Sequence, residues 1–201
     1  MDLHRYDNLD FDRGAPPWKE ALWVAARIVF FQNSIPWPSF LRTFLLRTFG
    51  AKIGRGFVIR SNVNISFPWR LIIGEHVWIG EDVGILSLAQ VLIESNVCVS
   101  QRAYLCTGSH DFLREDFKLK VAPITICRGS WVAACAFIGP GVEVGSGAVV
   151  SAGSVVFENV PPNSLVRGNP ANVVEEIRDR QTQFPILPSK ASAEAVNSGR
   201  I

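Results

Sequence analysis

Residues 124–157, ITICRGSWVAACAFIGPGVEVGSGAVVSAGSVVF, place an aliphatic residue at every sixth position. The same spacing extends back to residue 53, and each such position is Ile, Val or Leu: Ile53, Ile59, Ile65, Ile73, Ile79, Ile85, Ile93, Val99, Leu105, Ile126, Val132, Ile138, Val144, Val150 and Val156. This period differs from the roughly 3.6 residues of an amphipathic helix and the roughly 2 of an alternating strand. It predicts short strands joined by equal tight turns, three of which close one triangular coil of a solenoid.

Three longer gaps divide this repeat. The gaps at residues 65–73 and 85–93 are eight residues long, and the gap at residues 105–126 is twenty-one residues long. The long gap predicts an extruded loop at residues 111–125, directly after His110. A sandwich of short alternating strands is the competing fold, but its turns would not keep a fixed six-residue phase. We therefore expect five coils, at residues 53–70, 73–90, 93–110, 126–143 and 144–161.

Composition indicates one ordinary domain. The chain has 201 residues, of which 48% are hydrophobic, and that is enough apolar material for a real core. The net charge is +2 and no basic run occurs, so nucleic acid is not an expected partner. With no C-x-x-C pair and no cleavable signal peptide, we expect a cytoplasmic protein with four free thiols: Cys98, Cys106, Cys127 and Cys135.

The two ends lie outside the repeat. We expect residues 1–49 to form a flexible arm (1–15) and a helical cap (18–49) that is broken at residues 34–38. Such a cap would cover the first coil, whose strand edges would otherwise be open. The repeat domain itself is expected to span residues 50–172. For residues 173–201 we expect a short helix at 173–183 and a disordered tail from residue 185 onward.

The most hydrophobic segment near the start is WKEALWVAARIVFF, residues 18–31. It is too short for a membrane-spanning helix, which needs about 20 apolar residues, and Arg27 interrupts it. Two placements remain open. In one, the helix packs on the domain or on a neighbouring subunit. In the other, residues 18–49 rest as a peripheral element on the inner face of the membrane, with interfacial anchors at Trp18, Trp23 and Trp37.

Residues 124–174 join the repeat, its turn glycines and the closing PPNSLVRGNPA, and this combination resembles the hexapeptide-repeat acyltransferases. The resemblance covers about residues 40–178. More narrowly, the Pro-Trp, IGEDV and CTGSHD elements are similar to the exopolysaccharide, or colanic-acid-type, O-acetyltransferase branch. The resemblance implies a left-handed parallel β-helix, acetyl-CoA as co-substrate with no metal, and a homotrimer whose active sites lie between subunits.

The resemblance also places the catalytic histidine at His110, in TGSH. The other histidines are His4, in the arm, and His76, on an outward-facing coil position. A neutral imidazole, with an unperturbed pKa of about 6.5, is suited to removing the proton of a hydroxyl that attacks a thioester. The second ring nitrogen needs an orienting acceptor, and Asp111 and a backbone carbonyl are both candidates.

Two sets of binding residues follow from the same resemblance. Coenzyme A in this family lies along the outside of the later coils, and the matching positions here are Trp131, Ala134, Ala152, Gly153 and Arg167. The Thr-Lys pair often found near the end of the last coil is replaced here by Phe157-Glu158, which puts the usual phosphate contact there in doubt. The acceptor is expected to meet the second coil and the loop, at Ser87, Asp111 and Arg114.

Other functions are compatible with parts of the sequence. The γ-class carbonic anhydrases share the repeat, but catalytic zinc needs about three protein ligands, which three isolated histidines do not supply. An acyl-thiol route through Cys106 is open in principle, although we expect that residue to fill a small coil position. Other acceptors (a nucleotide-linked amino sugar, serine or an antibiotic) and a non-catalytic scaffold remain as alternatives. The favoured function is direct O-acetylation of a sugar hydroxyl of an exopolysaccharide precursor, through a tetrahedral intermediate.

Overall fold

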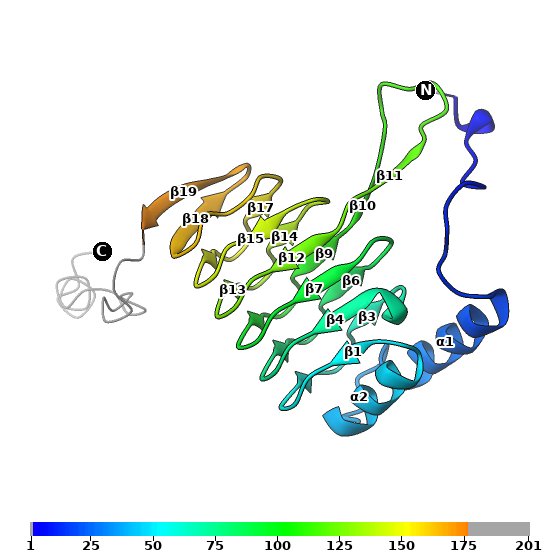
Figure 1. Ribbon diagram of the computed structural model, residues 1–201, viewed down its shortest axis with the longest axis horizontal. Coiled ribbons are helices and arrows are strands. Elements are labelled where there is room, and N and C mark those ends of the chain that lie inside the picture. Colours follow the sequence, from blue (N-terminus) through cyan, green and yellow to red (C-terminus); the bar gives the residue numbers. More distant parts are fainter. Residues whose placement is uncertain (1, 177–201) are drawn as a thin grey trace, which may run out of the picture.

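The chain folds into a three-sided prism of stacked coils, shown in Figure 1 for a computed structural model that describes residues 2–176. Each coil contributes one short strand to each side, and strands of successive coils pair in parallel. The solenoid of short strands predicted from the six-residue period is confirmed, and so is the all-β left-handed parallel β-helix that the family resemblance implied.

Each side of the prism is one sheet of short strands. The first side holds β1 (Lys52–Ile53), β4 (Leu71–Ile73), β7 (Val91–Ile93), β12 (Ile124–Ile126) and β15 (Glu143–Val144). The second holds β2 (Val58–Ile59), β5 (Trp78–Ile79), β8 (Cys98–Val99), β13 (Trp131–Val132), β16 (Val149–Val150), β18 (Ser164–Gly168) and β19 (Ala171–Glu176). The third holds β3 (Asn64–Ile65), β6 (Gly84–Leu86), β9 (Tyr104–Cys106), β14 (Phe137–Ile138) and β17 (Val155–Val156).

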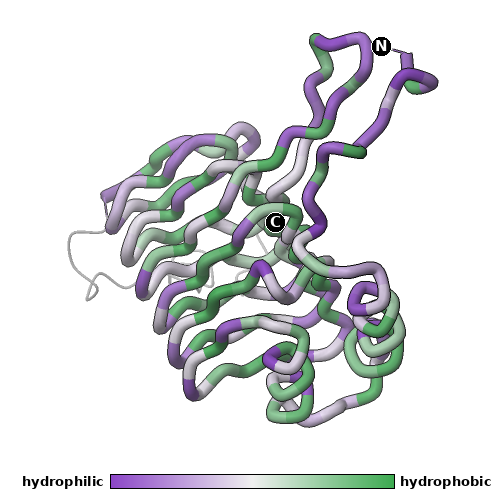
Figure 2. Tube along the Cα trace, turned by 45° about the vertical axis from the view of Figure 1, so that its right-hand side comes forward, coloured by the Kyte–Doolittle hydropathy of each residue, from purple (hydrophilic) through white to green (hydrophobic). Residues whose placement is uncertain are grey.

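The repeated aliphatic residues form the core along the prism axis. On the second side Ile79, Val99 and Val132 occupy the same register in successive strands, and all three are buried. Hydrophobic and hydrophilic residues follow one another in short steps along each coil (Figure 2). Because one coil alone leaves its apolar face open, the stacked columns supply the burial that holds the solenoid together.

Glycine often follows the core aliphatic residue because neighbouring coils approach closely there. A Cβ added at Gly80 would lie 2.6 Å from the amide nitrogen of Gln101 and 2.8 Å from the carbonyl carbon of Ser100. At Gly145 the same atom would lie 2.5 Å from the nitrogen of Pro162. These contacts are with backbone, which cannot rotate away, so a side chain at either position forces two coils apart.

Replacing Gly80 with alanine is therefore expected to lower the free energy of unfolding by about 1–3 kcal/mol, the usual cost of overpacking a tight site. Urea or thermal unfolding followed by circular dichroism measures this. Ser66→Ala is the matched control, since Ser66 follows Ile65 at the same repeat position and already carries a Cβ. Equal unfolding midpoints for the two variants would contradict the close-approach explanation.

Two helices cover the N-terminal end of the prism, α1 (Pro17–Phe30) and α2 (Ser39–Thr48). The first coil exposes one row of unpaired carbonyls on each of its three sides, because its own N–H groups bond to the second coil. The cap supplies at least one donor to each side: Arg47 Nη2 to Ile53 O at 2.8 Å, Ser39 Oγ to Ile59 O at 3.0 Å, and Trp23 Nε1 to Ile65 O at 3.0 Å.

These three bonds satisfy acceptors that would otherwise form an open sheet edge. No helix among residues 2–176 is long and apolar enough to cross a lipid bilayer.

The extruded segment begins earlier than predicted and is a hairpin. The chain leaves the third coil after β9 and returns at β12, so the excursion covers residues 107–123 instead of residues 111–125. Strand β10 (Gly108–His110) pairs antiparallel with β11 (Leu119–Val121). His110 therefore lies on the projecting hairpin and does not close the coil. The repeat could not reveal this, because no position of the six-residue repeat falls between Leu105 and Ile126.

The helix predicted for residues 173–183 is wrong in the part that the structure describes. Residues Ala171–Glu176 form β19, which folds back antiparallel on β18 after the turn at residues 169–170. The pairing gives the last strand of the second side a partner, and the β-branched pair Val173-Val174 suits a strand better than a helix. The rest of the predicted helix and the predicted tail lie outside the described residues.

Candidate active site

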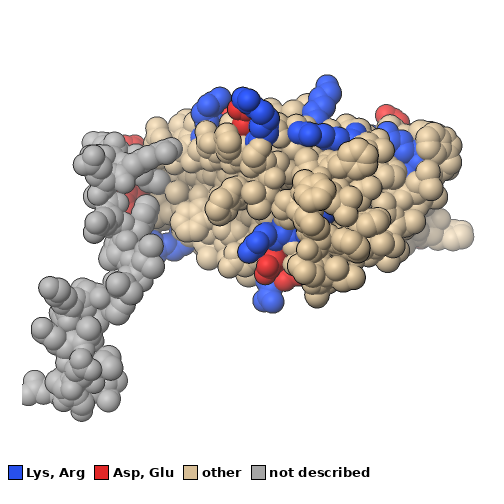
Figure 3. Space-filling model, turned by 90° about the horizontal axis from the view of Figure 1, so that it is seen from below, with Lys and Arg blue, Asp and Glu red and all other residues tan. Residues whose placement is uncertain are grey.

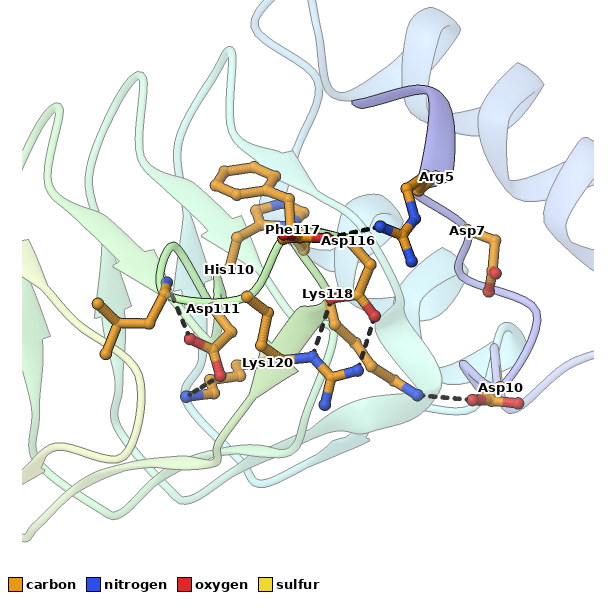
Figure 4. Close-up of polar contacts among 12 residues, drawn as sticks. Arg5, Asp7, Asp10, His110, Asp111, Asp116, Phe117, Lys118 and Lys120 are labelled. Atoms are coloured by element: carbon orange, nitrogen blue, oxygen red, sulfur yellow. Dashed lines mark hydrogen bonds and ion pairs between the residues drawn. The ribbon is translucent and has the colours of Figure 1, made fainter. Parts of the chain in front are cut away.

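His110 is held by two contacts within the hairpin and one from the N-terminal arm. Its Nδ1 lies 2.8 Å from the carbonyl oxygen of Phe117, and its ring stacks on the Phe117 ring with centroids 4.3 Å apart and planes at 3° (Figure 4). The ring of Tyr6 meets it edge-on at 5.5 Å. A carbonyl oxygen only accepts, so Nδ1 carries the hydrogen of this bond and Nε2 of the neutral ring carries a lone pair.

The orienting acceptor is therefore a backbone carbonyl and not Asp111. The Asp111 carboxylate lies 2.9 Å from Lys120 Nζ and also accepts from the amide of Leu113 at 3.2 Å. The hydrogen bond from Lys120 lowers the pKa of Asp111. Asp111 thus braces the hairpin across its two strands, and its carboxylate stays ionised at neutral pH.

Phe117 adopts an unusual backbone conformation that serves this arrangement. Its φ is 49°, in the left-handed region that non-glycine residues rarely enter. From there, both its carbonyl oxygen and its ring contact the same imidazole. The sequence reasoning missed this residue. A phenylalanine seven positions after a histidine gives no signal of its own.

Arg114, predicted as an acceptor contact, lies exposed on the hairpin. Its guanidinium forms a two-pronged bond with the Asp116 carboxylate at 2.7 and 2.8 Å, which lowers the pKa of Asp116 to about 2. This ion pair stabilises the conformation of the hairpin tip. The guanidinium keeps hydrogen-bond donors available beyond those two bonds.

The N-terminal arm, expected to be flexible, lies beside the hairpin in the structure (Figures 1 and 4). Lys118 Nζ meets the Asp10 carboxylate at 2.7 Å, and Arg5 Nη1 meets Glu115 at 2.6 Å. The bond from Lys118 also lowers the pKa of Asp10. These contacts bring Tyr6 to the histidine. The one signal in the sequence was charge, because the arm is rich in aspartate and the hairpin carries lysine at residues 118 and 120.

A groove of about 530 Å³ runs over the second side of the prism in the later coils. Val149 and Leu165 line it together with Ser100, whose Oγ accepts from Trp131 Nε1 at 2.8 Å. Four of the five residues predicted to bind coenzyme A line this groove: Trp131, Ala134, Ala152 and Arg167.

The fifth residue, Gly153, follows Ala152 at the turn and donates its amide to Ala134 O at 2.9 Å. No atom lies within 4 Å of the place where a Cβ of Gly153 would stand. Its φ of +69° shows that this glycine is used for the turn. The spacing of the repeat alone brings these small residues to one strip of surface.

Ser87, predicted to contact the acceptor, is not accessible to a substrate in the structure. Ser87 is completely buried, and its hydroxyl donates to Phe67 O at 3.0 Å and accepts from Phe67 N at 2.9 Å. Both bonds join the first coil to the second. The prediction of a substrate contact at Ser87 is therefore not supported, because the hydroxyl is shielded from solvent and used by the backbone.

Cys106 does not present its thiol to a substrate. Its thiol is buried and lies 3.1 Å from the carbonyl oxygen of Gly108, at the base of the hairpin. Within residues 2–176, no three His, Cys, Asp or Glu side chains come together in a group that could hold a metal ion.

His110 and the groove belong to different parts of the prism. The hairpin leaves from the end of β9, on the third side, whereas β13, β16 and β18 on the second side line the groove. No hairpin residue lines the groove. One chain thus presents a histidine and a groove as two separate candidate half-sites.

No protein-family model matches the chain. The protein named colanic acid biosynthesis acetyltransferase WcaF of Escherichia coli is 44% identical over 167 residues, which cover 82% of this chain and 90% of the relative. A solved galactoside acetyltransferase in complex with coenzyme A has a TM-score of 0.75 at 27% identity, covering 86% of this chain and 87% of its own.

A hexapeptide-repeat acetyltransferase from Vibrio cholerae, complexed with acetyl coenzyme A, has a TM-score of 0.72 at 28% identity, covering 83% of this chain and 92% of its own. The coil geometry, the identity to the Escherichia coli relative and its coverage agree: the chain belongs to the hexapeptide-repeat acetyltransferases.

Proposed function

We propose that the protein transfers an acetyl group from acetyl-CoA to a sugar hydroxyl of an exopolysaccharide precursor. The observation that carries the proposal is the fixed imidazole of His110, whose Nδ1 is bonded to Phe117 O and whose Nε2 has no hydrogen-bond partner among residues 2–176. The named functions of the relatives, colanic acid biosynthesis and galactoside acetylation, support a sugar as the acceptor.

The groove suits the pantetheine and phosphates of the co-substrate. It is mainly apolar, and Trp131, Ala134, Ala152 and Arg167 line it. Small side chains let a thin chain lie close to the backbone, and a guanidinium binds phosphate well. Acetyl-CoA supplies an acyl group activated as a thioester.

His110 acts as the general base in this proposal. Its Nε2 accepts the proton of the sugar hydroxyl while that oxygen attacks the thioester carbonyl carbon. The bond from Nδ1 to Phe117 O keeps the ring in the correct tautomer and stabilises the charged imidazolium that forms. The same Nε2 then returns the proton to the leaving thiolate as the tetrahedral intermediate collapses. The buried Cys106 takes no part.

We infer a homotrimer with active sites between subunits. The support is the separation of the two half-sites on one chain, because a histidine on one side of the prism can meet a groove on another side only across a subunit boundary. Flat prism sides suit such packing, and closed rotational symmetry repeats the contact three times. We place the protein in the cytoplasm, where reducing conditions keep its cysteines free.

An acceptor panel tests the reaction. The purified protein is given acetyl-CoA with neutral oligosaccharides, lipid-linked oligosaccharides, a nucleotide-linked amino sugar or serine, and thiol release is followed. We expect acceptor-dependent release with the oligosaccharides and a product that mild alkali cleaves, since an ester is labile there and an amide is stable. An alkali-stable product from an amino sugar would favour the N-acetyl alternative. No release with any acceptor would favour the scaffold.

A further inference from the structure

The two cap helices expose apolar side chains on the side that faces away from the prism. Inward, Trp23 is buried against the first coil. Outward, Trp18 is 65% exposed, Phe40 is 75% exposed and Phe44 is 63% exposed. Leu22, Ile28 and Val29 are exposed on the outer part of α1 as well. Exposed apolar side chains that gather on one surface mark an interaction site, so this outer surface of α1 and α2, the cap surface, calls for a partner.

Charge is distributed unevenly around the cap surface. Residues 15–60 hold seven Lys and Arg residues and one acidic residue, Glu20, whereas the rest of the chain holds thirteen basic and seventeen acidic residues. Glu20 is itself paired with Arg13 at 2.7 Å. Five of the seven basic residues have no acidic partner among residues 2–176: Lys19, Arg27, Arg42, Arg47 and Lys52. Arg42 is buried on three backbone carbonyls, Lys19 and Arg27 are partly buried, and Arg47 and Lys52 are exposed.

Seen from below, the right-hand part of the molecule, where the helices lie, is a broad area without charged side chains, and Lys and Arg gather along one of its borders (Figure 3). Exposed aromatic and aliphatic residues with a basic surround are the pattern of elements that lie in a membrane interface. Basic side chains near an anionic leaflet are attracted to it over about a Debye length.

We propose that the cap surface docks on an anionic phospholipid bilayer. In this arrangement Phe40, Phe44 and Trp18 enter the interface, and Lys52 and Arg47 face lipid phosphates. A second copy of the chain is the other conceivable occupant. It fits less well, because a symmetric contact between two cap surfaces would bring two ends of net positive charge together.

Vesicle sedimentation tests the proposal without any reference to catalysis. The full chain is mixed with sucrose-loaded vesicles of phosphatidylcholine alone or of phosphatidylcholine with phosphatidylglycerol. We expect binding to the anionic vesicles, with a partition coefficient at least about tenfold lower in the double variant Phe40→Ser/Phe44→Ser, since affinity follows the buried apolar area. Lys52→Glu is expected to weaken binding to anionic vesicles, and added salt to weaken it further.

The matched control is Phe112→Ser/Leu113→Ser, which removes two equally exposed apolar side chains from the hairpin and is expected to leave vesicle binding unchanged. Light scattering of Phe40→Ser/Phe44→Ser distinguishes a bilayer from a second copy of the chain as the partner of the cap surface. A lower particle mass than that of the unmodified protein would assign the cap surface to protein contacts and overturn the proposal. Absence of binding by the unmodified protein, or equal binding by the cap variant, would overturn it too. The cap variant Phe40→Ser/Phe44→Ser is expected to transfer acetyl groups to a soluble acceptor as the unmodified protein does. A failure of the membrane proposal would therefore not contradict the proposed reaction.

Discussion

Replacing His110 with alanine is expected to lower kcat/KM for acetyl transfer by at least about 100-fold, the scale on which removal of a general base acts. The loss arises because the attacking hydroxyl then gives its proton to water while the transition state forms. The fold should be unaffected, since His110 lies on a projecting hairpin whose strands are joined by backbone bonds. Thiol release with the preferred acceptor, measured beside the thermal unfolding midpoint, separates the two effects.

His76→Asn is the matched control for this variant. His76 lies in the second coil, is exposed, and has a φ of 55° that asparagine tolerates. Its replacement is expected to leave kcat/KM within about twofold, as is usual for surface substitutions away from a site. If His110→Ala retained activity, the base would have to be sought elsewhere, and the half-site on the hairpin would lose its assigned role.

Replacing Ala152 with phenylalanine is expected to raise KM for acetyl-CoA at least about tenfold, which corresponds to a loss of about 1.4 kcal/mol of binding. Ala152 is exposed and lines the groove, so a benzyl group there takes space that we assign to the pantetheine. Because the obstruction affects substrate and transition state alike, kcat should change much less than KM. Initial rates over a range of acetyl-CoA concentrations give both constants.

Ala152→Ser provides the comparison for the groove variant. Serine adds one oxygen to the same exposed position, so KM should stay near that of the unmodified protein. A variant with phenylalanine that kept its KM would place the co-substrate outside the groove. If kcat fell while KM held, the residue would lie near the reacting atoms and not along the pantetheine.

The fold was readable from the sequence because the repeat is enforced by packing at every coil. Every core position must be aliphatic, as at Ile79 or Val99, since it touches the same position in the coils above and below. The ends were harder to predict. Val173-Val174 form a strand, not a helix, because the last coil offers an edge that takes a partner, and no periodic signal reports such an edge.

The groove was predictable for the same reason as the fold, whereas the surroundings of His110 were not. Ala134 and Ala152 share a position in successive coils, so their neighbourhood follows from counting residues. The imidazole depends instead on Phe117 and Tyr6, which reach it from a hairpin and from an arm more than a hundred residues away. Such contacts come from tertiary folding of irregular segments, for which spacing carries no information.

The three donors that meet the carbonyls of Ile53, Ile59 and Ile65 also have a consequence for assembly. A stack of identical coils has no intrinsic length, and its bare end would template strands from another molecule as the tip of a growing fibril does. Arg47, Ser39 and Trp23 occupy the acceptors that such growth would need. The helices thus block end-to-end pairing of strands between molecules. They let a chain rich in stacking strands fold as an enzyme of finite length instead of growing into a filament.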